Sequence, residues 1–196
     1  MATSGTFTSV SGSWTATRPT AKGSSSADAT WIGIGGVTKT DLIQAGTANV
    51  VDAAGNVTTT AFYELLPAAA QNIISMTVNP GDSMTSTISY AGGKWTISIT
   101  DVTTGQNFTK VLTYASSFSS VEWIQEAPTN LSGSLYTLDG FGTASFSRGS
   151  AVNNGASTTI FNAGVSSINM VDSTSKVIAK TLALGSDGAS FSVVRQ

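Results

Sequence analysis

Short runs of alternating bulky and small polar residues, broken by turn residues about every ten positions, constrain this chain more than any other feature. The turn sequences at 79–82 (Asn-Pro-Gly-Asp) and 91–93 (Ala-Gly-Gly), for example, bracket one strand-like run. The single helix-like patch, residues 68–72, is short. The pattern therefore predicts an all-β protein, an antiparallel β-sandwich.

The expected strands are spread over the whole chain, and neither an internal repeat nor a linker divides them. They cover residues 5–17, 30–34, 41–47, 58–66, 73–78, 83–90, 94–101, 107–114, 121–127, 141–148, 166–171, 177–184 and 189–194. We therefore expect one domain over residues 1–196, long enough to bury a hydrophobic core.

Composition removes several classes of function. Cysteine and histidine are both absent, which excludes disulfides, thiolate sites, Ser-His triads and the usual zinc sites. We expect neither a metal nor a cofactor. Only 10% of residues are charged, against roughly 25% in typical domains. The nine Lys and Arg are scattered, so nucleic acid is not an expected partner.

Targeting signals are equally sparse. No apolar stretch is long enough for a transmembrane helix, and the polar start at Met1 does not read as a signal peptide. In a chain with few carboxylates, protonation in acid changes the free energy of unfolding little. Low charge and an acidic pI therefore favour a mature, secreted protein that works in an acidic extracellular setting.

The stretch 121–128 (Val-Glu-Trp-Ile-Gln-Glu-Ala-Pro) holds two of only eleven carboxylates in the chain. On a strand, Glu122, Ile124 and Glu126 share one face. One interpretation is a half-solvated strand. The other is that one of these carboxylates performs chemistry in a cleft.

Three further positions show unusual residues for their strand faces. Trp31 shares a face with two glycines, which indicates either a core tryptophan at a bulge or a stacking surface beside open backbone. Gln44 lies among apolar neighbours and needs hydrogen-bond partners if buried. It is either a satisfied core amide or a donor aimed into a cleft. Glu64 shares its face with Phe62 and Leu66.

These segments resemble a known family. Residues 31–36 (Trp-Ile-Gly-Ile-Gly-Gly) and 42–46 (Leu-Ile-Gln-Ala-Gly) are similar to the tryptophan-glycine and leucine-glutamine segments of the glutamic peptidases, the eqolisins. Residues 121–126 are similar to their second signature, a glutamate directly before Trp-Ile, and 63–67 to a segment that lines their substrate groove. Each motif alone is weak; their order and the pairing of glutamine with glutamate make the joint resemblance specific.

The resemblance implies a sandwich of two bent sheets whose concave face forms a substrate groove for polypeptides. Glu122 would activate a water molecule as general base, and Gln44 would orient that water and stabilise the tetrahedral intermediate. The physical logic agrees, because a carboxylate is the strongest base left without histidine and an amide can stabilise an oxyanion at acid pH. The remaining groove residues would be Trp31, Phe62, Glu64 and Leu66. We expect Gln44 and Glu122 on neighbouring strands, and Glu126, close to the turn at Pro128, in contact with solvent. We further expect a monomer whose action at acid pH is insensitive to pepstatin.

Some positions depart from the family pattern. Gly35 stands where fungal relatives usually have an acidic residue, and Leu65 and Leu66 replace aromatic residues of the groove segment. These changes leave the cleavage preference open. The absence of cysteine is typical of a prokaryotic branch.

Two other functions are compatible with the same residues. A glycoside hydrolase needs two carboxylates roughly 5 to 9.5 Å apart. Glu122 and Glu126, four residues apart on one strand, are separated by about 13 Å, so Glu64 would have to lie opposite Glu122 instead. A lectin-like module that binds sugars on a sandwich is the second alternative.

Overall fold

The computed structural model describes residues 1–20, 25–37, 39–130 and 133–196, and all its regular elements are strands. They are β1 (Phe7–Thr15), β2 (Ser26–Gly35), β3 (Leu42–Val51), β4 (Val57–Leu65), β5 (Gln71–Asn72), β6 (Ser83–Ala91), β7 (Lys94–Asp101), β8 (Asn107–Leu112), β9 (Val121–Glu126), β10 (Thr137–Leu138), β11 (Thr143–Asn153), β12 (Ala156–Thr159), β13 (Met170–Val171), β14 (Val177–Thr181) and β15 (Phe191–Arg195). Within these ranges, no helix is long and apolar enough to span a membrane.

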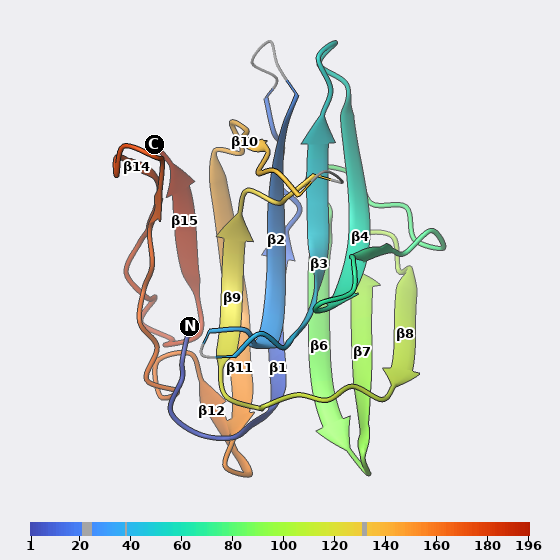
Figure 1. The fold of residues 1–196 in the computed structure, drawn as a ribbon, viewed down its shortest axis with the longest axis vertical. Helices are drawn as coiled ribbons and strands as arrows, with labels where there is room; N and C mark the ends of the chain where they lie inside the picture. The colour runs from blue at the N-terminus through green and yellow to red at the C-terminus, as the bar shows by residue number, and fades with distance from the viewer. Residues whose placement is uncertain (21–24, 38, 131–132) are drawn as a thin grey trace.

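The strands form two sheets that lie face to face (Figure 1). The smaller sheet has the order β10-β2-β3-β4-β5, and β9 pairs with the same edge of β2 as the short β10. The larger sheet runs β13-β14-β15-β11-β1-β6-β7-β8, with β12 paired to β11. All pairings are antiparallel except the two-residue contact of β10 with β2. The predicted antiparallel sandwich is confirmed.

The core between the sheets follows from the alternation of side chains along each strand. On the smaller sheet, Ile32, Ile34 and Ile43 are completely buried against the large side chains of the other sheet, among them Trp14 and Trp95. Residues of the opposite parity therefore lie on the outer face of the smaller sheet, which points away from the larger sheet. That outer face carries the residues singled out from the sequence.

Several predicted elements were wrong. In the helix-like patch 68–72, residues 68–70 form a bend and irregular structure and residues 71–72 form β5, and residues 73–78 form turns and irregular structure instead of a strand. Residues 166–171 are extended only at β13, and the short strands β10 and β12 were not predicted. These segments are short or lie at sheet edges, where pairing partners decide the structure more than the local sequence does.

Candidate functional site

A row of four residues crosses the outer face of the smaller sheet. In the register of the strands, Gly33 of β2 pairs with Gln44 of β3 on one side and with Glu122 of β9 on the other. Glu64 of β4 continues the row beside Gln44. Residues directly opposite each other in antiparallel strands point to the same face. The structure therefore brings Gln44, Glu64 and Glu122 together on one face.

The strand order corrects one expectation. We expect Gln44 and Glu122 on neighbouring strands, but β2 lies between β3 and β9, which places the two main chains about 10 Å apart. The intervening residue of β2 is a glycine, so position 33 itself places no side chain between them. A Cβ atom at Gly33 would lie 2.9 Å from both Leu42 Cδ1 and Trp31 Cζ3. The tips of these two side chains therefore cover the glycine between Gln44 and Glu122.

Both polar side chains are almost inaccessible under this cover. Gln44 is 5% exposed and Glu122 only 2%. Neither carboxylate oxygen of Glu122 hydrogen-bonds to another described residue, and the same holds for Oε1 of Gln44 and the hydroxyl of Ser120. Buried polar atoms normally have partners, and unpaired ones point to strain, catalysis or a bound molecule. The side chains of Gln44, Ser120 and Glu122 therefore keep polar atoms that can still form hydrogen bonds with a ligand.

Burial controls the protonation of Glu122. Loss of solvent raises the pKa of Glu122 to about 8, although the nearby Ser120 hydroxyl and the amino group of Met1 act in the opposite direction. The negative charge of Asp41 adds to the rise. A hydrogen bond from Gln44 to Glu122 would lower the pKa of Glu122, but Gln44 does not make this bond while the tips of Leu42 and Trp31 cover Gly33. Burial therefore has a larger effect on the pKa of Glu122 than the groups that oppose it.

Gln44 is oriented by its other neighbour in the row. Its side-chain Nε2 donates a hydrogen bond to Oε2 of Glu64. Burial raises the pKa of Glu64, and the bonds from Gln44 and from the main chain of Ala70 oppose that rise. A glutamine held in this way keeps a second N–H available on the same nitrogen.

Apolar side chains form a small cluster beside the polar row. Trp31, Leu42 and Phe62 are buried together on the outer face, and Leu66 and Ile124 pack against them. Phe62 lies directly across β3 from Trp31, because both residues pair with Gly46. The indole N–H of Trp31 has no hydrogen-bond acceptor within bonding distance among the described residues. The predicted substrate-binding residues therefore share one face with Gln44 and Glu122, and their role stays a prediction.

Glu126 is less exposed than we expect from its position before Pro128. It is half-buried, and burial raises the pKa of Glu126 to about 7. The indole of Trp31 opposes this rise and the charge of Glu64 increases it. Sequence reasoning also missed Leu42 and Ser120. Leu42 stands two residues before Gln44, on the same face, and this spacing was the only available signal.

A cavity of about 480 Å³ lies beside the outer edge of β9, and neither Gln44 nor Glu122 lines it. Among the described ranges, no group of three or more acidic residues is placed to hold a metal ion. The groove therefore remains a prediction, and the chemistry of the row is that of carboxyl and amide groups.

Comparisons with known proteins place this arrangement in context. The model of the peptidase A4 family matches residues 1–193. Scytalido-glutamic peptidase, solved with a transition-state analogue, superposes with a TM-score of 0.82 at 22% identity, covering 99% of this chain and 95% of that chain. Aspergilloglutamic peptidase from Aspergillus niger gives 0.77 at 22% identity, covering 87% and 99%. The eqolisin SCP-B, bound to the tripeptide Ala-Ile-His, gives 0.76 at 21%, covering 99% and 94%. No curated protein sequence matches the chain.

Proposed function

The chain belongs to the peptidase A4 family, the glutamic peptidases or eqolisins, and from this membership we propose that Glu122 and Gln44 form its catalytic pair. The observation that carries the proposal is their common register with Gly33, so that the row between them is covered by the tips of Leu42 and Trp31 and not by a side chain at position 33. In the described pairings of β2 with β3 and β9, Glu122 and Gln44 are the carboxylate and amide that face each other across a glycine.

The proposed reaction hydrolyses a peptide bond without a covalent intermediate. The ionised carboxylate of Glu122 takes a proton from water while the water oxygen attacks the scissile carbonyl carbon. The Nε2–H group of Gln44 that is not bonded to Glu64 donates to the developing oxyanion. Protonated Glu122 then gives its proton to the amide nitrogen, the C–N bond breaks, and a carboxylic acid and an amine leave. The carboxylate is regenerated for the next turnover.

In this proposal, substrate binding also has to displace the side chains that cover Gly33. The tips of Leu42 and Trp31 cover Gly33 in the free protein, so they move aside when a peptide reaches the pair. Water and polar substrate groups then solvate Glu122, and its pKa falls from about 8 towards the roughly 4.3 of a free glutamate. This change lets a carboxylate that is neutral in the closed state act as a base in the acid range.

The apolar cluster and Glu64 supply the binding surface in this proposal. Trp31, Phe62 and Leu66 offer an apolar face for substrate side chains next to the scissile bond. Glu64 fixes the amide of Gln44. We extend the proposal to a monomeric, secreted enzyme that acts in an acidic medium. The glycosidase alternative loses support, because Gly33 and Gln44 separate Glu122 from Glu64 by three strand spacings, about 14 Å between main chains.

Digestion of an acid-denatured protein, followed by mass spectrometry of the released peptides, tests the proposal. Wild type should cleave in the presence of pepstatin, and Glu122→Gln should lose activity by at least about 10³-fold. Glu126→Gln is the matched control on the same strand face and should keep most activity. Equal losses in both variants would assign the base to the wrong glutamate, and a fully active Glu122→Gln would end the proposal.

A further inference from the structure

The hydroxyl group of Tyr114 is built into the end of the pairing between β3 and β4. Tyr114 lies on the connection from β8 to β9, which crosses the smaller sheet at the end where β3 begins (Figure 1). The main-chain N–H of Leu42, the first residue of β3, donates a hydrogen bond of 2.8 Å to this hydroxyl. The hydroxyl has one proton to donate, and the main-chain oxygen of Leu66 at 2.8 Å is a nearer acceptor than that of Leu42 at 3.2 Å.

The hydroxyl replaces one hydrogen bond of an antiparallel pair. The N–H of Leu66, one residue past β4, bonds directly to the oxygen of Leu42 at 2.9 Å. In regular pairing, the N–H of Leu42 would bond back to the oxygen of Leu66. Here the Tyr114 hydroxyl stands between these two groups and bonds to both. It therefore sets the spacing of the two main chains at this end of the sheet.

The rest of Tyr114 is anchored to the larger sheet. Its main-chain oxygen accepts a hydrogen bond of 3.1 Å from the indole N–H of Trp95, which is completely buried. Its half-buried ring packs against the main core. Because the main chain and the ring are both held, the hydroxyl has a fixed position relative to the core. Removal of the hydroxyl alone leaves these anchors in place.

A second set of bonds joins the same connection to the residue before Leu42. Asp41 accepts hydrogen bonds from the main-chain N–H of Ser117 at 2.7 Å and from the hydroxyls of Ser116 and Ser117, both at 3.1 Å. Burial acts to raise the pKa of Asp41, but these bonds lower it below its ordinary value, so they favour the charged carboxylate. Asp41 therefore keeps the start of β3 attached to the connection even without the Tyr114 hydroxyl.

Both residues that the hydroxyl holds belong to the apolar cluster beside the proposed catalytic pair. Leu42 is buried there with Trp31 and Phe62, and Leu66 packs against them. Without the hydroxyl, the N–H of Leu42 and the oxygen of Leu66 either stay unpaired or bond directly after the main chains shift. In both cases the two leucine side chains lose their defined spacing.

We propose that Tyr114 is a positioning residue for substrate specificity: its hydroxyl fixes the spacing of Leu42 and Leu66, and this spacing favours peptides with a bulky apolar side chain next to the scissile bond. The inference rests on the proposed function, in which the cluster binds substrate side chains. Tyr114 acts through the two leucines and not on the reacting atoms. The register of Gln44 is set farther along β3, by its pairing with Gly33 and Glu64.

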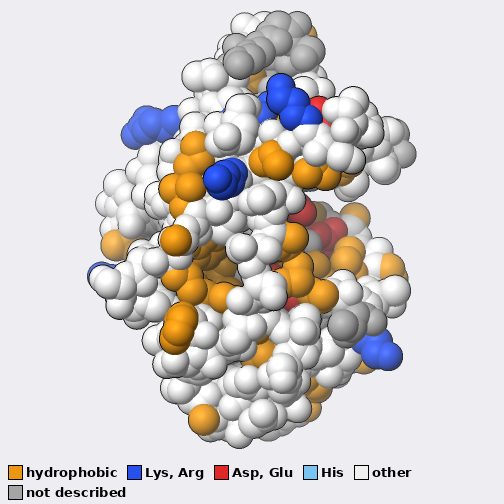
Figure 2. Space-filling model, turned by 90° about the vertical axis from the view of Figure 1, so that its left-hand side faces the viewer, with side chains coloured by type: hydrophobic (Ala, Val, Ile, Leu, Met, Phe, Trp, Pro, Cys, Tyr) orange, Lys and Arg blue, Asp and Glu red, His pale blue; other side chains and the backbone are white. Residues whose placement is uncertain are grey.

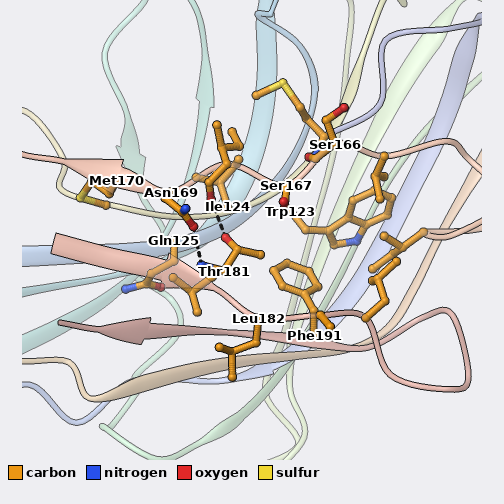
Figure 3. A pocket seen from close by; sticks show the side chains of 17 residues that line it. Trp123, Ile124, Gln125, Ser166, Ser167, Asn169, Met170, Thr181, Leu182 and Phe191 are labelled. Carbon is orange, nitrogen blue, oxygen red and sulfur yellow. Dashed lines mark hydrogen bonds between the residues drawn. The ribbon is translucent and has the colours of Figure 1, made fainter. Parts of the chain in front are cut away.

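The Tyr114 contact lies away from the large cavity of the molecule. Hydrophobic side chains gather around the hollow beside β9 (Figure 2). Trp123 and Phe191 are among the residues that line it (Figure 3), whereas Leu42, Leu66 and Tyr114 are not. A change at the Tyr114 hydroxyl therefore tests the cluster without altering the wall of this cavity.

Selectivity between two peptides tests the inference. The substrates are matched peptides with either leucine or alanine at both residues that flank the scissile bond, and kcat/KM is measured at acid pH for wild type and Tyr114→Phe. Wild type should prefer leucine, and in Tyr114→Phe the leucine-to-alanine ratio should fall by about three- to tenfold, the range expected for a lost hydrogen bond. The alanine peptide should keep its kcat/KM within about twofold. Equal losses on both peptides, an unchanged ratio, or a wild type that does not prefer leucine would overturn the inference.

Amide hydrogen exchange tests the contact without any cleavage. The Leu42 amide should exchange at least about fivefold faster in Tyr114→Phe, whereas the Gln44 amide, paired with Glu64, should stay within about twofold. Tyr90→Phe is the matched control, because Tyr90 is also half-buried and its ring lies 4.9 Å from that of Phe118 on the same connection. This control should match wild type in exchange and in selectivity.

An unchanged Leu42 amide, or equal changes in Tyr114→Phe and Tyr90→Phe, would refute the role of the hydroxyl. The exchange result does not depend on the activity of Glu122→Gln. Failure of the proposed catalytic pair and failure of the Tyr114 contact are therefore told apart.

Discussion

Asp139→Asn should make the protein more stable at neutral pH while changing little in acid. Asp28 is fully buried and accepts hydrogen bonds from Thr17 Oγ1 (2.6 Å), Asn49 Nδ2 (2.8 Å) and Gln125 Nε2 (2.7 Å). Asp139 is also buried, and neither of its carboxyl oxygens hydrogen-bonds within the described chain.

The magnitude follows from the protonation of Asp139. Burial and the charge of Asp28 raise the pKa of Asp139 from 3.8 to about 8, despite the nearby Arg195. Well below pH 3.8 the carboxyl is protonated in both the folded and the unfolded state and has no effect on stability. Between pH 4 and 8 unfolding releases a proton, so the free energy of unfolding falls as pH rises. One pKa unit is worth about 1.4 kcal/mol, so the loss by pH 8 reaches at most about 6 kcal/mol.

Urea denaturation followed by tryptophan fluorescence measures this change. At pH 4, Asp139→Asn should match wild type within about 1 kcal/mol, because both side chains are then neutral. At pH 8, the variant should be more stable by several kcal/mol, within the ceiling of about 6 kcal/mol. The control is Asp172→Asn in an exposed turn, where hydrogen bonds from Thr174 lower the pKa of Asp172, so no gain at pH 8 is expected. A variant without a gain at pH 8, or with equal gains at both pH values, would refute the reasoning.

Two further predictions concern the catalytic row. Gly33→Ala inserts a methyl group between Gln44 and Glu122 and displaces the tips of Leu42 and Trp31. The value of kcat/KM should fall by about 10²-fold, while the far-ultraviolet circular dichroism stays unchanged. Wild-type activity in this variant would contradict the placement of the pair. The acid limb of kcat/KM reports free Glu122 and should lie at higher pH than the limb of kcat, because substrate entry lowers the pKa from about 8. Coincident limbs in steady-state profiles between pH 2 and 8 would show that solvation of Glu122 does not change on binding.

The sequence predicted which strand face each site residue occupies better than it predicted which strands lie next to each other. Parity gave the face-mates of Gln44, Glu64 and Glu122 within each strand, because the side-chain period of a strand is fixed, and the family resemblance placed the three residues on one face. It could not show that β2 lies between β3 and β9, since β9 joins β2 across more than 80 residues of intervening chain. Long-range pairing is decided by burial of the whole sandwich, which no local pattern contains.

The same limit applies to the groups that set the pKa values. Leu42 and Trp31 cover Gly33 through their rotamers, which a strand pattern does not specify. Asp139 meets Asp28 only because β10 pairs with the start of β2. Its two-residue length gave no strand signal. The strand face of each residue could therefore be derived from the sequence. The side chains that cover Gly33, the position of the cavity and the contact between Asp28 and Asp139 could not.

A double-mutant cycle on Gln44 and Glu122 tests the central claim most directly. Single-turnover rates of peptide cleavage at acid pH would be measured for wild type, Gln44→Ala, Glu122→Gln and the double variant. Gln44→Ala alone should lower the rate by about 10²–10³, the usual cost of one oxyanion donor. Residues that act as one unit are not additive, so the double variant should be no slower than Glu122→Gln alone, within about threefold. Losses that multiply, or a fully active Gln44→Ala, would contradict a catalytic pair acting across Gly33.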